Sequence, residues 1–237
     1  MQTQYGTRDI TLAQARQEAS TVFLAKVFNW MAIGLAITGG VAFFTAESGL
    51  VRSLIASPLF FILILAELGL VFFLSARIDK IQPGTATGLF VGYSVLNGVT
   101  LSTIFLAYTH ASIAATFLIT AGMFAAMAVY GMVTKRDLSG MGSFMFMGLI
   151  GILLASVVNI FLKSSALYWA ISAIGVLVFV GLTAYDVQKI KTMGEEGIMQ
   201  QGEAAIRKGA IIGALALYLD FINLFLMLLR FFGGNRD

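Results

Sequence analysis

The sequence predicts an all-α integral membrane protein with seven transmembrane helices. Of its 237 residues, 59% are hydrophobic and only 11% are charged, and the mean hydropathy is +0.90. A soluble domain carries roughly 25% charged residues, so this chain has too little charge to cover itself with a water-facing surface. Its apolar residues come in blocks of about 20, the length that an α-helix needs to cross a hydrocarbon core of about 30 Å.

Seven apolar stretches follow one another, separated by charged or turn-forming residues. The first 20 residues are polar and lack the apolar core of a signal peptide, so the first span is expected to act as the insertion signal and to stay in the protein. Residues 109–110 predict a tight hairpin, while residues 187–208 form the longest connection. The predicted spans are residues 22–45, 58–74, 86–108, 111–133, 142–162, 166–186 and 209–232.

The chain is expected to form a single seven-helix transmembrane domain, residues 22–237, after a polar N-terminal tail of residues 1–21. None of the connections has the composition of a soluble domain. The formal net charge of +3 is too small and too dispersed to suggest nucleic-acid binding. The lipid bilayer is therefore the expected surrounding of most of the chain.

The distribution of positive charge predicts the orientation of the helices, because loops that stay in the cytoplasm carry an excess of Lys and Arg. Ten of the 15 Lys and Arg residues lie in the N-terminal tail or in loops on its side of the membrane, and four lie on the opposite side. Lys26 lies near the start of the first span and can snorkel to the more basic side. The N-terminus is therefore expected in the cytoplasm and the C-terminus outside.

Three acids lie within or at the ends of the predicted spans, where a charge costs at least ~2.5–3.5 kcal/mol and so needs a reason. Asp220 lies near the middle of the seventh span and is the strongest candidate for an ion or proton route. Glu67 lies in the second span, where a hydrogen bond to a neighbouring helix explains an acid as well as an ion route does. Asp186 ends the sixth span, where pairing with Lys189 is the simpler interpretation. Asn223 lies one turn from Asp220 on the same helix face.

The sequence disfavours an enzyme. It has no cysteine and one histidine, whereas a catalytic zinc site needs three protein ligands. The seventh span has no lysine between Gly209 and Leu229 that could hold retinal as a Schiff base. No nucleophile–base pair and no phosphate-binding loop is present, so no cofactor is expected.

Three stretches carry a family resemblance: ThrLysArgAspLeuSerGly at 134–140, ThrAlaTyrAspValGlnLysIleLys at 183–191, and LeuTyrLeuAspPheIleAsnLeuPheLeuMetLeuLeuArgPhePheGly at 217–233. Together with the seven spans they resemble the transmembrane Bax-inhibitor-motif family in its bacterial branch. The resemblance implies six helices around a central, hydrophobic seventh helix. It also implies a bacterial inner-membrane location and a pH-sensitive calcium leak, with Ca²⁺ as the transported ion.

The resemblance assigns a role to particular residues. It makes Asp186 and Asp220 a proton-sensing carboxylate pair and a weak Ca²⁺ site, and it makes Arg77 the basic modulator of that pair. Glu67 matches an acid that precedes this arginine in the family's second helix, although the spacing between the two residues differs slightly. Glu67 and Asn223 are candidate pore or ion contacts. Two carboxylates ~4 Å apart repel by about 4 kcal/mol at an effective dielectric of 20, so such a pair would share one proton near neutral pH.

Helix geometry sets a condition on that pair. Measured from the nearest basic residues at 1.5 Å per residue, Asp186 is about 5 Å deep in the membrane and Asp220 about 18 Å. The two can meet only if the seventh helix begins outside the bilayer, around residues 203–207, or if the sixth helix is displaced. Two other functions remain open: a proton-coupled cation exchanger, and a non-conducting regulator that binds membrane proteins, such as quality-control proteases, through its N-terminal tail.

Overall fold

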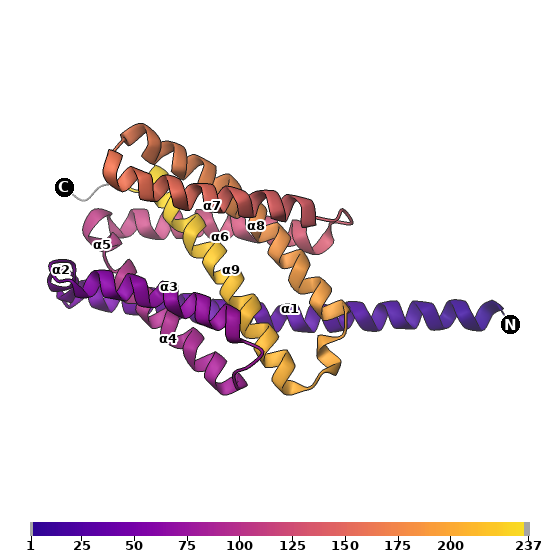
Figure 1. Cartoon of the computed structure of the whole chain (residues 1–237). Helices are drawn as coiled ribbons and strands as arrows, with labels where there is room; N and C mark the ends of the chain where they lie inside the picture. The colour runs from indigo at the N-terminus through magenta and orange to yellow at the C-terminus, as the bar shows by residue number, and fades with distance from the viewer. Residues whose placement is uncertain (1, 235–237) are drawn as a thin grey trace. The chain divides into compact units, whose positions relative to one another are not determined.

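The computed structural model describes residues 2–234, and it describes side chains for residue 12 and from residue 14 onward. Helices account for nearly all of these residues (Figure 1). Their bounds are α1 Gln2–Glu47, α2 Leu50–Ile55, α3 Leu59–Arg77, α4 Pro83–Leu101, α5 Ile104–Ala107, α6 His110–Val133, α7 Ser139–Leu162, α8 Ser165–Glu195, the 3₁₀ helix η1 Ile198–Gln200, and α9 Glu203–Phe232.

Seven helical segments in the described part of the chain are long and apolar enough to cross a membrane, which confirms the predicted all-α architecture with seven spans. They are Gln14–Glu47, Leu59–Arg77, Pro83–Ala107, His110–Val133, Ser139–Leu162, Ser165–Glu195 and Glu203–Phe232. The last of these is the most buried: 72% of its most apolar window is buried, against 6% to 44% for the others. This burial agrees with the central place expected for the seventh helix.

The first helix is longer than the predicted span. The backbone of the N-terminal tail continues the same helix back to Gln2, so α1 is 46 residues long. Most side chains of the tail, including Arg8, lie outside the described residues, as does the whole of Arg236. The described part of α1 first becomes buried at Ser20 and Phe23, where its apolar face begins.

The end of the sixth span was predicted wrongly. We expected the helix to stop at Asp186, but α8 continues to Glu195, and the connection to α9 is correspondingly short. The reason is that Val187 and Ile190 are buried and Gly194 packs against Ser20. Apolar and small residues therefore continue at helical spacing on one face, although the charged residues between them end the continuously apolar block.

The third span also differs from its prediction. α4 ends at Leu101, and the short helix α5 completes the span to Ala107. The hydroxyl of Ser102 donates to the carbonyl oxygen of Val99 at 2.6 Å. Such a local bond from a serine side chain competes with the regular helix pattern, and it marks the place where the two helices are joined.

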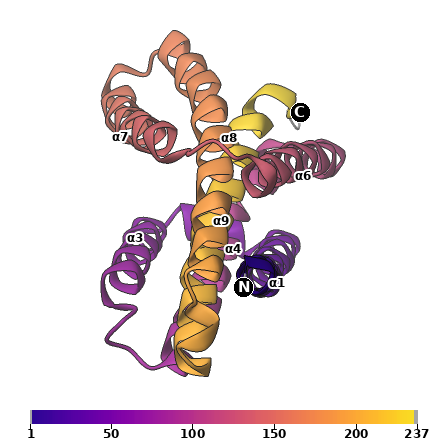
Figure 2. The ribbon, with the colours of Figure 1, turned by 90° about the vertical axis from the view of Figure 1, so that its right-hand side faces the viewer.

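By its internal contacts the chain forms two units, and the first comprises Met1–Ser102 with Lys189–Leu215. Within it, α4 lies between α1 and α3 (Figure 2). A side chain on Gly98 would collide with the backbone oxygen of Thr38, so this glycine allows α1 and α4 to approach closely. The first half of α9 belongs to the same unit, where Gly213 packs against Val27 of α1.

The second unit comprises Thr103–Gln188 with Ala216–Asp237. Within it, α8 lies between α6 and α7 (Figure 2). Gly131 of α6 meets the backbone of Ala184, and Gly142 of α7 meets the ring of Tyr185. The second half of α9 packs on α7 and α8 through one apolar cluster whose buried members are Ile152, Ile171, Val178, Phe179, Leu182, Leu224, Met227 and Leu228.

Candidate functional site

Asp220 is a buried acid in the most buried span. Its side chain is 4% exposed, and it follows Leu217 and Tyr218, both fully buried. Phe221, the next residue of α9, packs against α6. Its ring centroid lies 5.2 Å from that of Phe117 and 5.5 Å from that of Phe124. These aromatic contacts hold α9 against α6 at the depth of Asp220 and exclude water from that side of the helix.

The structure brings Asp186 and Asp220 together within the second unit. The side chain of Asp186, which is half-buried on α8, forms a hydrogen bond with the side chain of Asp220. Ionised carboxylates only accept hydrogen bonds, so a hydrogen bond between two acids forms only when one of them carries a proton. The contact is therefore the geometry that a proton-sharing pair would need.

The second oxygen of Asp220, Oδ2, is buried and has no hydrogen-bond partner among the described residues. A buried polar atom without a partner loses the hydrogen bonds that it had in water, which costs ~1–3 kcal/mol and more when the group is charged. This oxygen is therefore available to accept from a water molecule or to bind a cation.

The lengths of α8 and α9 explain how two acids at different apparent depths meet. α9 begins at Glu203, within the stretch that the depth argument required, and its first turns precede the apolar block. α8 continues nine residues beyond Asp186 to Glu195, so Asp186 lies inside the helix instead of at its end. Counting depth from the nearest basic residue placed Asp186 too close to the helix end.

Glu67 lies in the first unit and has partners on the neighbouring helix. Its two carboxylate oxygens accept hydrogen bonds from Thr100 Oγ1 at 2.8 Å and from Asn97 Nδ2 at 3.3 Å, so α3 and α4 are joined by polar contacts inside the span. This is the helix-bridging role that we gave as the alternative for Glu67. Asn97 stands out in the sequence as an amide in the middle of a span. Nothing in the sequence singles out Thr100, which follows about one helical turn later.

Arg77 and Asn223 are less buried than Asp220. Arg77 is exposed in the last turn of α3, where a positive charge favours the negative end of the helix dipole, and it belongs to the first unit. Asn223 is half-buried and donates to the carbonyl oxygen of Leu219 on its own helix at 2.8 Å. The structure thus shows one contact for Asn223 that is internal to α9.

Gln188 makes contacts that the sequence did not reveal. It lies in the stretch 183–191 that carries the family resemblance, and both ends of its side-chain amide bind the loop between α6 and α7. Within residues 2–234, no three His, Cys, Asp or Glu side chains gather as a metal site. A calcium ion at the aspartate pair would therefore need carbonyl oxygens or water as further ligands.

Seven spans, with two acids in contact inside the second unit, define the class: a polytopic membrane protein with acidic side chains within its spans. Residues 20–237 match the family described as "Inhibitor of apoptosis-promoting Bax1". The chain belongs to this Bax inhibitor family, which confirms the resemblance carried by the three sequence stretches.

The family's bacterial relatives cover almost the whole chain. Inner membrane protein YbhL of Escherichia coli (strain K12) is 55% identical over 231 residues, which are 97% of this chain and 98% of that protein. An uncharacterized protein of Borreliella burgdorferi is 49% identical over 233 residues, 96% and 99% of the two chains. An uncharacterized membrane protein of Streptococcus pyogenes serotype M1 is 39% identical over 217 residues, 90% and 93%. The protein is accordingly a multi-pass protein of the inner membrane.

Proposed function

We propose that the protein is a pH-sensitive calcium leak channel gated by protonation of the Asp186–Asp220 pair. The observation that carries this proposal is the hydrogen bond between two acids inside the apolar spans, one of them almost completely buried. Intramembrane acids commonly mark ion or proton routes, and two carboxyl groups in contact exchange a proton as one unit.

Protonation keeps the route closed in this proposal. While the pair holds its proton, the carboxyl groups bind each other and tie α8 to α9. When the proton leaves, two neighbouring carboxylates repel each other, and this repulsion separates the helices at that point. The separated carboxylates offer Ca²⁺ the oxygen ligands that it prefers. Oδ2 of Asp220 is one of them, since it has no hydrogen-bond partner within the described residues.

Three further residues have assigned roles in this proposal. Arg77 favours the deprotonated pair through its positive charge and so sets the pH at which the route opens. Glu67 and Asn223 are contacts for the ion along its path.

The N-terminus lies in the cytoplasm, as the distribution of Lys and Arg predicts.

The test is calcium flux into liposomes that contain the full-length protein, measured as a function of pH. For the wild type we expect the flux to fall as the medium becomes acidic, by up to about tenfold per pH unit below the midpoint, the limit for one titrating proton. Asp186→Asn and Asp220→Asn remove one titrating group each and should abolish this pH dependence. Asp79→Asn, which changes an exposed acid of the first unit, is the matched control and should leave it unchanged.

The possible results separate the competing functions. An unaltered pH dependence in both aspartate variants would overturn the role of the pair. A calcium flux that dissipates a preset pH gradient would replace the leak with a proton-coupled exchanger. Absence of any flux from the wild type would contradict a channel and would favour a non-conducting regulator, whose binding to membrane proteins should then depend on residues 1–20.

A further inference from the structure

One side chain fastens α8 to the loop between α6 and α7. The backbone N–H of Leu138 donates to Oε1 of Gln188, and Nε2 of Gln188 donates to the carbonyl oxygen of Arg136, both at 2.9 Å. Leu138 is only 5% exposed, so its N–H has lost most of its contact with water and needs a protein acceptor. The amide of Gln188 therefore binds the loop backbone with both of its ends.

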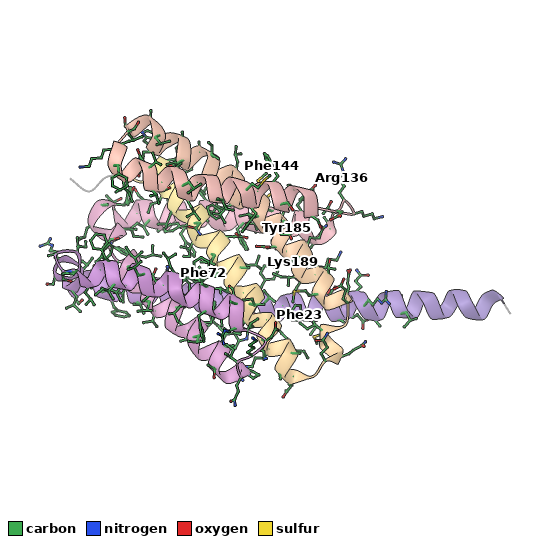
Figure 3. All side chains as sticks on the ribbon, in the orientation of Figure 1. Phe23, Phe72, Arg136, Phe144, Tyr185 and Lys189 are labelled. Carbon is green, nitrogen blue, oxygen red and sulfur yellow. The ribbon has the colours of Figure 1, made fainter. Side chains whose placement is uncertain are left out.

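Two glycine contacts hold the same stretch of α8. A side chain on Gly131 of α6 would collide with the carbonyl oxygen of Ala184, and one on Gly142 of α7 would collide with the ring of Tyr185. Figure 3 labels Tyr185 on α8 and Arg136 on the loop, where the arginine side chain points away from the helices. Residues 184–188 are thus fixed by α6, by α7 and by the loop that joins them.

Helix geometry separates this fastening from the acid that lies within it. At 3.6 residues per turn, Tyr185 and Gln188 are three residues apart and share a face, whereas Gln188 is turned by about 200° from Asp186. The face with Gln188 meets the loop, and the face with Asp186 meets Asp220 of α9. Gln188 is therefore able to act on the acid pair only through the position of the helix.

From this arrangement we infer that Gln188 is a positioning residue for the acid pair: by clamping α8 to residues 136–138, it holds Asp186 against Asp220. This inference deepens the proposed function and rests on it for the role of the pair in gating. Loss of the clamp should let this part of α8 move away from α9. A change of about 1 Å in a carboxylate separation near 4 Å is enough to move the titration midpoint by about half a pH unit.

Charged and titratable neighbours offer a competing electrostatic explanation of any such shift. α7 contributes none of these groups, and the other elements carry them as follows: Tyr168, Tyr185, Asp186, Lys189, Lys191 and Glu195 on α8, Lys135, Arg136 and Asp137 on the loop, His110 and Tyr130 on α6, and Glu203, Arg207, Lys208, Tyr218, Asp220 and Arg230 on α9. Gln188→Met removes both hydrogen bonds of the clamp, keeps the length of the side chain and changes no charge. A shift in this variant therefore reports position and not charge.

The experiment compares Gln188→Met with Gln200→Met in the full-length protein in lipid bilayers, Gln200 being an exposed glutamine of the first unit. Faster hydrogen exchange at residues 136–138 verifies that the clamp is open. The midpoint of the pair is read from the infrared band of protonated carboxyl groups during a pH titration, with the Asp186→Asn, Asp220→Asn double variant as the blank. We expect Gln188→Met to move that midpoint, and the midpoint of calcium flux, by about half a pH unit or more to lower pH.

Each combination of results has a distinct meaning. Faster exchange at the loop with an unmoved infrared midpoint would overturn the positioning role. A moved infrared midpoint without any calcium flux in the wild type would keep the positioning role and contradict the proposed channel. If Gln188→Met does not fold, Gln188→Asn, which shortens the amide by one methylene, replaces it; a wild-type midpoint in that variant, together with fast loop exchange, would also overturn the inference.

Discussion

Asp220 and Glu67 are both acids inside apolar spans, but their surroundings differ. Glu67 accepts hydrogen bonds at both carboxylate oxygens from Asn97 and Thr100. Asp220 bonds to a second acid, and its Oδ2 has no hydrogen-bond partner in the part of the chain that the structure describes. Both positions were evident from the sequence, because a charge in an apolar block is visible without a structure. Their partners were not evident, because they come from other helices and depend on how these pack.

Asp137, in the loop before α7, provides a pH-dependent test at the scale of one residue. Its carboxylate accepts the backbone N–H of Ser139 at 2.9 Å, and hydrogen bonds from the hydroxyl and the backbone of Ser139 hold the pKa of Asp137 below its usual value. A lowered pKa in the folded state means that this stabilisation is complete above the unfolded pKa of about 3.9. It is lost as the pH falls through the lower folded value.

We therefore expect the hydrogen-exchange protection of the Ser139 amide to decrease as the pH falls below about 4. Asp137→Asn keeps an acceptor oxygen without a titrating group, so protection in this variant should not depend on pH. Asp137→Ala should lose protection at every pH. Wild-type protection that stays constant through acidic pH would contradict the bond.

At the scale of the elements, the apolar blocks predicted the number of spans but not where the helices end. α8 exceeds its prediction by nine residues because buried Val187 and Ile190 continue the packing face among charged residues. Hydropathy averages over all faces of a helix, so it ends the span at the first charges. The same averaging hid Gln188, which is a polar residue among polar neighbours until the loop that it binds is placed beside it.

The close approach of α6 and α8 provides the test at this scale. Gly131→Ala places a methyl group against the backbone oxygen of Ala184, which has no side-chain freedom with which to move aside. Such overpacking typically costs ~1–3 kcal/mol, so we expect a lower melting temperature in detergent. Gly122→Ala, on an exposed site of the same helix with nothing within 4 Å, should stabilise slightly because alanine favours the helix. Equal melting temperatures would contradict the tight contact.

At the scale of the whole molecule, the sequence predicted one membrane domain, and that remains a prediction beside the two contact units of the structure. The pair and its clamp lie entirely in the second unit, while Arg77 and Glu67 lie in the first. The family resemblance supplied the pairing of Asp186 with Asp220, which spacing along the chain had made difficult to expect. Long-range contacts of this kind follow from packing, which a single sequence does not display.

The orientation of the whole chain is open to a direct test because the sequence contains no cysteine, so a single introduced cysteine reports its own location. Gln200→Cys and Ser165→Cys place thiols at exposed positions, the first at the end of η1 and the second at the start of α8. The excess of Lys and Arg on the N-terminal side predicts that residue 200 faces the cytoplasm and residue 165 faces outward. A membrane-impermeant maleimide added to intact spheroplasts should therefore label position 165 fully and position 200 only after permeabilisation. Labelling in the reverse pattern would show that the orientation is opposite to the predicted one. The clamp formed by Gln188 would then lie on the outer side of the membrane.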